Sequence, residues 1–340
     1  MKRPLLFAAL LAVAAIIAAV VINRDKSNPD VAGGIPQPTD PASEISKTKS
    51  QSSPAPGWHG WPSDVPAPAI APFNGEQAKQ HQEAWAKYLN VPVEYTNSIG
   101  IKFVLIPPGE FMRGSSPEEI AQALGSAGDD KLWQETINSE GPQHKVVLTK
   151  AIYIGVYEVT QGQFEQVMGR NPSRFGPMGA SKDTIADLDT TSFPVEKVSW
   201  DEATRFCIQL GKVQELTDDA YRLLTDAEWE FSCRAGTTTG FWIGENHQER
   251  LQTAWTYENS AERTHAIGEL KENPFGLYDV HGNVWEWVQD AWDPTFYGQL
   301  QGQLAVDPIK PSIAGAPHVT RGGCWSSSIS SSRSASRCPV

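Results

Sequence analysis

From Val91 to the end of the chain, short apolar runs alternate with glycine, proline and asparagine. Three of them are IKFVLIPPGEFMRG, HKVVLTKAIYIGVYEVT and HVTRGGCW, which begin at Ile101, His144 and His318. Apolar runs of this length between turn-forming residues are typical of short strands joined by many turns. We therefore expect one irregular α+β domain over residues 91–340, with few short helices and much loop.

The few helices are marked by capping boxes. In this motif the first side chain accepts a hydrogen bond from the first turn of the helix, and the residue three positions on bonds back. The helices after the last three boxes should be short and amphipathic, with Ala227, Trp229 and Phe231 on the apolar side of the last one. A longer helix is expected over residues 75–90, with Trp85, Tyr88 and Leu89 on one side. The four boxes are Ser116–Glu119, Thr160–Gln163, Ser199–Glu202 and Thr225–Glu228.

The N-terminus predicts a location outside the cytoplasm. Lys2 and Arg3 precede residues 4–22, a segment of 19 residues without a charge. About 20 apolar residues span a bilayer, whereas a cleaved signal peptide usually has a shorter apolar region. Residues 1–24 are therefore predicted to be a membrane anchor, with a signal segment as the alternative. Residues 25–74 form a Pro/Ser-rich linker, in which Trp58 and Trp61 are candidates to dock on the folded part.

Charge and cysteine content narrow the class of partner. The net charge of -12 argues against nucleic acid, because phosphate binding needs a basic face. The four cysteines form no CxxC pair, so a zinc site is not expected. An oxidising compartment would allow one disulfide. The alternative is that Cys207 and Cys233 are small buried apolar residues.

Residues 276–287, GLYDVHGNVWEW, carry the clearest cluster of oxygen ligands. Asp279, Asn283 and Glu286 lie within eight residues, and Gly276 and Gly282 permit turns or a close approach of the backbone. Such a cluster could bind a hard cation such as calcium, helped by backbone carbonyls. The alternative is a turn whose Asp and Asn side chains bond the backbone.

This segment resembles GLYDMxGNVWEW, the hallmark of the formylglycine-generating enzyme, or sulfatase-modifying factor, family. The resemblance spans residues 100–337 and implies a loop-rich, C-type lectin-like α+β fold. The other matching motifs follow in the family's order: FVLIPPGEFMRGS, IYIGVYEVTQGQFEQVMGRNPSRF, PVEKVSWDEATRFC, YRLLTDAEWEFSCRAGTTTG and RGGCW.

The resemblance also implies a structural calcium ion. Its ligands here would be the side chains of Asp279 and Glu286 and the carbonyls of Gly282 and Val284. Asn259 would belong to a second calcium site of the family, although the loop around it matches poorly.

The same resemblance argues against the family's chemistry. Family enzymes oxidise a cysteine of a sulfatase to formylglycine, using copper(I) held by two thiolates just after an RGGS motif. The corresponding stretch here, RGGCWSSSISSSRSASR, places Ser327 and Ser332 at the two cysteine positions. A hydroxyl is a hard ligand and does not replace a thiolate on copper(I), so copper is not expected. Cys324 could bind a metal or react; the alternative is a small residue packed beside Trp285 and Trp325.

Family domains continue to a last strand that ends in GFR, whereas this sequence stops at Val340. Either the last strand is dispensable here or the sequence is truncated. A missing core strand would leave an unpaired sheet edge, for which a disulfide from Cys338 to Cys233 or Cys207 could compensate.

The function predicted from these features is a non-catalytic, membrane-anchored module outside the cytoplasm that binds a protein or a glycan, with a sulfatase as one candidate. Groove candidates are Trp285, Arg321 and Trp325, and further contacts are expected from Trp242, Trp255 and Trp292. The alternative is a formylglycine-generating oxidase with a divergent site. An oxidase of another kind would need a ligand set that the sequence does not show.

Overall fold

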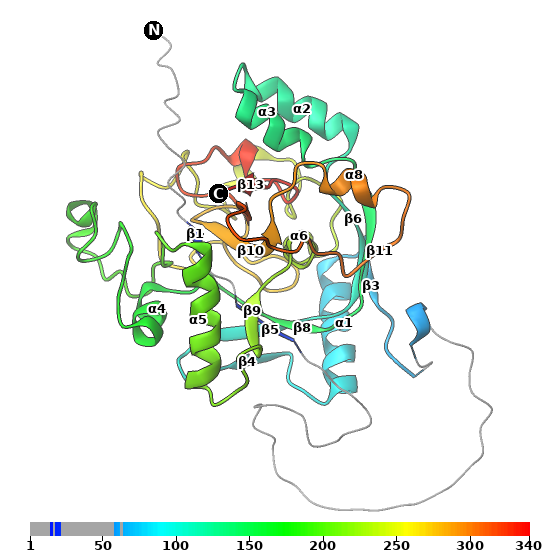
Figure 1. The fold of residues 1–340 in the computed structure, drawn as a ribbon, viewed down its shortest axis with the longest axis horizontal. Helices are drawn as coiled ribbons and strands as arrows, with labels where there is room; N and C mark the ends of the chain where they lie inside the picture. The colour runs from blue at the N-terminus through cyan, green and yellow to red at the C-terminus, as the bar shows by residue number, and fades with distance from the viewer. Residues whose placement is uncertain (1–13, 16–17, 22–57, 62–63) are drawn as a thin grey trace, which may run out of the picture.

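The computed structural model of the chain describes residues 14–15, 18–21, 58–61 and 64–340 (Figure 1). Short strands joined by long loops dominate the fold, as the sequence predicts. The strands are β1 (Ala14–Ala15), β2 (Ala18–Val21), β3 (Ala69–Ile70), β4 (Glu94–Thr96), β5 (Lys102–Ile106), β6 (Gly109–Arg113), β7 (His144–Leu148), β8 (Ile152–Gly155), β9 (Tyr221–Leu223), β10 (Trp285–Ala291), β11 (Ala305–Val306), β12 (His318–Arg321) and β13 (Cys338–Pro339).

These strands form three sheets. The first has the order β1-β10-β12-β13, the second β11-β7-β6-β3, and the third β4-β5-β8-β2-β9. In the first sheet, Glu286 of β10 lies opposite Arg321 of β12, and Thr320 lies opposite Cys338 of β13. This pairing brings the segment 276–287 next to the RGGCW segment.

All four predicted capping boxes are formed, at the starts of α2, α4, α5 and α6. The helix predicted over residues 75–90 is α1, which ends at Leu89, and Asn90 caps it in a left-handed conformation. The helices α2 and α3 form a hairpin at the top of Figure 1, away from α1 and α5. The helices are α1 (Gly75–Leu89), α2 (Pro117–Ala127), α3 (Lys131–Asn138), α4 (Gln161–Met168), α5 (Trp200–Val213), α6 (Asp226–Arg234), α7 (His247–Arg250) and α8 (Phe296–Leu300), with the short 3-10 turns η1 (Trp58–Gly60), η2 (Lys182–Ile185) and η3 (Ile329–Ser331).

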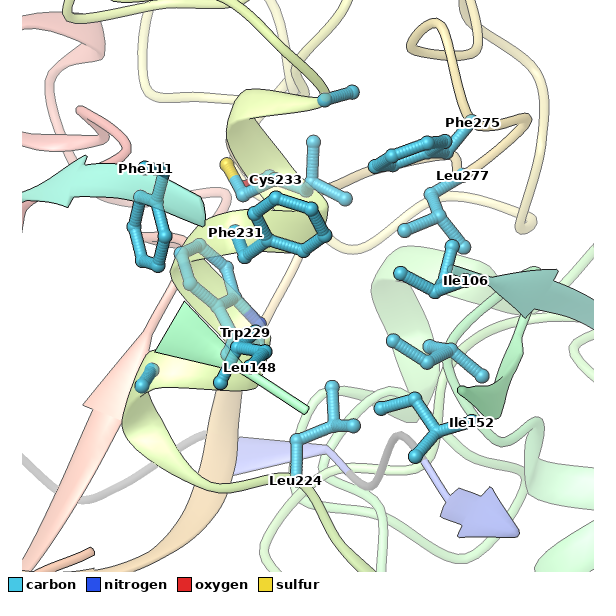
Figure 2. Close-up of a cluster of buried hydrophobic side chains, with 14 of the residues drawn as sticks. Ile106, Phe111, Leu148, Ile152, Leu224, Trp229, Phe231, Cys233, Phe275 and Leu277 are labelled. Carbon is cyan, nitrogen blue, oxygen red and sulfur yellow. The ribbon is translucent and has the colours of Figure 1, made fainter. Parts of the chain in front are cut away.

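Helix α6 runs through the core, and all nine of its residues are buried. Figure 2 shows Trp229, Phe231 and Cys233 of this helix between Phe111 and the opposing side chain of Phe275. The prediction of an amphipathic helix is therefore wrong for α6. Its polar residues are buried because they form ion pairs inside the protein, described below, rather than a solvated face.

The N-terminal part differs from the prediction in two ways. Ala14–Ala15 and Ala18–Val21 of the predicted membrane helix are extended strands, and the other residues of segment 4–22 lie outside the described residues. No helix in the described ranges is long and apolar enough to cross a membrane. Within the predicted linker, β3 pairs with β6 and Ala69 is fully buried, so the folded part begins before residue 75.

Trp58 and Trp61 dock on the folded part. Trp61 makes an edge contact with Trp85 of α1, and the Trp58 indole N–H donates to the carboxylate of Glu110 on β6. Packing of large aromatic surface explains why two tryptophans interrupt a stretch that is otherwise typical of a linker.

The four cysteines are all buried and all free. The prediction that Cys338 pairs with Cys233 or Cys207 is wrong, and the alternative of small buried residues holds for both Cys207 and Cys233. Burial raises the pKa of these two thiols to about 12, which keeps them protonated and unreactive.

Candidate functional site

The candidate cation site is a tight turn that leads into β10. Asp279 and Asn283 adopt left-handed backbone conformations, with φ of 58° and 61°. Asp and Asn tolerate this conformation best among residues with a side chain. Gly282 lies so close to another loop that an added Cβ atom would come within 2.4 Å of the carbonyl oxygen of Trp255. The backbone therefore requires glycine at position 282.

Three buried carboxylates gather at this turn: Asp279, Glu286 and Glu158. Glu158 accepts hydrogen bonds from the Asn283 amide at 2.9 Å and from the Val284 N–H at 3.3 Å. Asp279 accepts from the Gly268 N–H at 2.8 Å, and Glu286 from the Trp229 indole at 2.5 Å. One oxygen of Asp279 and one of Glu286 are buried and have no hydrogen-bond partner among the described residues.

Each of the three buried carboxylates at this turn has a raised pKa. Burial raises the pKa of Asp279 to about 7 and, with the nearby charge of Asp279, that of Glu286 to about 8. Burial and the same two neighbours also raise the pKa of Glu158 well above its usual range. Like charges in a low-dielectric site repel strongly, and a bound cation would offset both this repulsion and the unpaired oxygens.

The oxygen donors at this turn are of the type that hard cations such as calcium bind. Carboxylate oxygens and backbone carbonyls are the ligands that calcium prefers. Among the described residues, no group of three or more His, Cys, Asp or Glu side chains forms a metal site by itself. An ion here would therefore need the carbonyls of Gly282 and Val284 besides Asp279 and Glu286.

Glu158 joins the buried carboxylates of the candidate cation site, whereas Asn259 holds its own loop together. The sequence analysis does not single out Glu158. It stands as a lone carboxylate in the apolar run IYIGVYEVT. A carboxylate at the end of a buried strand needs a partner, and this is the signal that could have identified it. Asn259 instead holds its own loop: its amide donates to the carbonyls of Leu251 and Ala254, and its oxygen accepts from the Thr256 N–H. Its side chain is therefore occupied without a metal.

The serine loop, residues 326–332, contains the two positions at which the resemblance places thiolates. Ser332 is fully buried against Gly323, where an added Cβ atom would come within 2.2 Å of the Ser332 hydroxyl. The Ser327 hydroxyl instead accepts from the Cys324 N–H and lies 3.2 Å from the Cys324 sulfur. Residues 326–332 thus offer hydroxyl oxygens, which are hard donors, and the buried Cys324 thiol lies beside them.

A second cysteine lies near the serine loop without forming a reactive pair. The Cys233 sulfur is 3.9 Å from both ring nitrogens of His281, which is bonded through Nδ1 to the Ser332 carbonyl. Burial lowers the pKa of His281 to about 4. The pKa of the Cys233 thiol, about 12, lies far above that of His281, so transfer of the thiol proton to this imidazole is strongly unfavourable.

Arg321 does not line a groove, contrary to the prediction. It is fully buried, and its guanidinium binds Asp226 at 2.5 Å and Glu230 at 2.9 Å, both on α6. Trp285 is also buried, and it packs in one core cluster with Cys324 and the partly buried Trp325. Only Trp325 of the three groove candidates keeps part of its side chain at the surface.

The exposed aromatic residue beside the serine loop is Tyr257, which sequence reasoning missed. Its side chain is 64% exposed, and its N–H donates to the Ser327 carbonyl. The next residue, Glu258, accepts from the Ser328 hydroxyl, and Arg174 lies 5.9 Å from the Trp325 ring centroid. By contrast, Trp242, Trp255 and Trp292 are each half-buried.

The fold and this site define a loop-rich α+β domain with a buried carboxylate turn beside an RGG loop. The chain belongs to the family of the sulfatase-modifying factor enzyme 1-like domain, whose family model matches residues 92–339. This confirms the family that the sequence motifs indicate, and the loop-rich fold that the family implies.

Curated relatives include formylglycine-generating enzymes and a serine/threonine-protein kinase. The chain is 33% identical over 161 residues to the formylglycine-generating enzyme of Streptomyces coelicolor, covering 44% of this chain and 46% of that protein. It is 28% identical over 240 residues to the serine/threonine-protein kinase pkn1 of Chlamydia pneumoniae, covering 66% of this chain and 33% of the kinase. The chain thus spans only a third to a half of the length of these relatives.

Solved structures share the fold. Treponema denticola variable protein 1 superposes with a TM-score of 0.57 at 25% identity, covering 74% of this chain and 94% of that one. PvdO from Pseudomonas aeruginosa gives a TM-score of 0.56 at 23% identity, covering 73% and 91%, and this likeness shows the fold alone.

Proposed function

We propose that this domain is a non-catalytic binding module that recognises a protein or a glycan. The observation that carries the proposal is the donor set of the serine loop. Ser332 is buried against Gly323, and Ser327 is bonded to Cys324, so hydroxyls replace the thiolates that copper(I) chemistry needs. A sulfatase is one candidate partner, because relatives of this chain are formylglycine-generating enzymes.

The binding surface would lie around the serine loop. Tyr257 and Trp325 offer aromatic surface, and Arg174 beside Trp325 adds a positive charge. Aromatic rings with polar neighbours are common anchors in recognition sites.

A turnover assay separates this proposal from the alternative of a formylglycine-generating oxidase. The purified chain is incubated with copper, oxygen and a peptide containing Cys-x-Pro-x-Arg, and the peptide mass is followed. The formylglycine-generating enzyme of Streptomyces coelicolor serves as the positive control. We expect no conversion by this chain, and conversion of the cysteine to formylglycine would contradict the proposal.

The carboxylate turn would hold a structural calcium ion, with Asp279 and Glu286 as side-chain ligands and Gly282 and Val284 as carbonyl ligands. Calcium added to chelator-treated protein should raise the melting temperature, because a ligand that binds only the folded state stabilises it. Glu286→Gln should abolish this rise, and the exposed control Glu249→Gln should keep it. An unchanged melting temperature of the wild type on addition of calcium would contradict the assignment.

The chain would act outside the cytoplasm, at a membrane or after export. The uncharged segment 4–22 after Lys2 and Arg3 supports this location. Protease added to intact cells that express the chain should digest the domain only if the domain lies outside, so a fully protected domain would contradict this part of the proposal.

A further inference from the structure

The third sheet contains a strand that comes from the N-terminal apolar segment. Strand β2 (Ala18–Val21), which is dark blue in Figure 1, lies between β8 and β9 and pairs antiparallel with both. Ala19 lies opposite Ile154 of β8 on one side and Arg222 of β9 on the other. Among the described strands of this sheet, β9 pairs only with β2.

The space between β8 and β9 needs an extended chain for a physical reason. All four residues of β8 are buried, and Tyr221 and Leu223 of β9 belong to a core cluster. Backbone N–H and C=O groups that are buried without a partner cost about 1–3 kcal/mol each. A strand inserted between β8 and β9 supplies these partners on both sides at once.

Strand β2 belongs to the uncharged segment 4–22, the same segment that predicts a membrane helix. A transmembrane helix satisfies its backbone groups within the segment itself. Residues 18–21 cannot make these helical bonds and the ladders to β8 and β9 at the same time. The two uses of the segment therefore exclude each other.

We infer that the space between β8 and β9 is a strand-binding site, and that residues 18–21 of the same chain are its occupant. Docking of this strand withdraws the apolar segment from any membrane and completes the third sheet. The domain thereby carries its own competitor to membrane insertion.

Hydrogen exchange of the purified full chain tests this inference. In Ala19→Pro, the ring removes a backbone donor from an interior strand. Exchange in the peptides that cover residues 152–155 and 221–223 should become at least ten-fold faster. The control is Ala12→Pro, which breaks a helix through the segment equally well but lies outside β2, and it should leave exchange unchanged. Equal exchange in the wild type and Ala19→Pro would overturn the inference.

A cross-link keeps the test valid if Ala19→Pro fails to fold. Val21 lies opposite Ile152, and directly opposed strand residues are within the Cα separation of a disulfide. The pair Val21→Cys/Ile152→Cys should therefore close with diamide, which takes up the two electrons and two protons of the thiols. The shifted pair Val21→Cys/Gly155→Cys, about 10 Å apart by strand geometry, should not close. No link in the matched pair, or a link found only between two chains, would overturn the assignment.

Discussion

At the scale of single residues, the carboxylate turn depends on one glycine. An added Cβ atom on residue 282 would come within 2.4 Å of the Trp255 carbonyl oxygen, and this backbone atom cannot move aside cheaply. The same close approach holds the loop of Trp255 against the turn, because the Asn283 N–H donates to that carbonyl at 2.8 Å.

Gly282→Ala should therefore lower the free energy of unfolding by about 1–3 kcal/mol or more, as overpacking does in a closely packed site. The control Gly298→Ala has no heavy atom within 4 Å of its added Cβ. Urea denaturation measures both variants, and equal midpoints for the two would contradict the close contact.

A second residue, Glu196, makes stability depend on pH. Burial raises its pKa to about 7, and one of its oxygens has no hydrogen-bond partner in the part of the chain that the structure describes. A carboxyl whose pKa is higher in the folded state than in the unfolded state binds more protons when folded, so stability falls as pH rises from about 4.5 to about 7.

Between pH 5 and pH 8, the wild type should lose about 1–3 kcal/mol of stability relative to Glu196→Gln. Glu196→Gln has no titrating side chain at position 196. The exposed control Glu165→Gln should show the same dependence of stability on pH as the wild type. Chemical denaturation at the two pH values gives the comparison, and parallel pH profiles of wild type and Glu196→Gln would contradict the account.

At the scale of elements, local sequence signals are sufficient to predict where four of the helices begin. The four capping boxes are all formed because each depends only on residues three positions apart. By contrast, the burial of α6 could not be predicted, because the partners of its polar residues come from Arg113 on β6 and Arg321 on β12. Only the tertiary fold brings these strands to the helix.

Ser199→Ala tests one capping box. Its hydroxyl accepts from the Glu202 N–H at 3.3 Å at the start of α5. The substitution should lower the free energy of unfolding by about 1 kcal/mol. The exposed Ser330→Ala, which caps no helix, is the control, and a loss no larger than that of the control would argue against the cap.

At the scale of the whole molecule, an ion network joins the ends of the domain. Asp226 on α6 binds Arg113 at 2.6 Å, Arg321 at 2.5 Å and Arg337 at 3.2 Å, all with fully buried side chains. Burial alone would raise the pKa of Asp226, but the three guanidinium groups together hold it well below its usual range. Asp226 thus connects three segments that are distant in sequence.

Asp226→Asn should lower the free energy of unfolding by about 3–5 kcal/mol, because buried guanidinium groups would lose their counter-charge. The exposed control Asp219→Asn should change it little. Thermal unfolding of the two variants decides, and similar melting temperatures would contradict the role of the network.

The sequence also limits what can be predicted of the site. Asp279, Gly282, Val284 and Glu286 lie close together because they are close in sequence, in the turn before β10 and at the start of that strand. The motif gives the position of Arg321 in the sequence but not the direction of its side chain, which strand pairing turns toward α6.

An anaerobic copper(I) titration against a chromophoric chelator tests most directly whether the serine loop lacks a copper(I) site. The wild type, with Ser327 and Ser332, should leave the metal on the chelator, because hydroxyls are hard ligands. Ser327→Cys/Ser332→Cys should withdraw up to one equivalent and shows that the assay detects such a site. A wild-type chain that withdraws one equivalent of copper(I) would contradict the account.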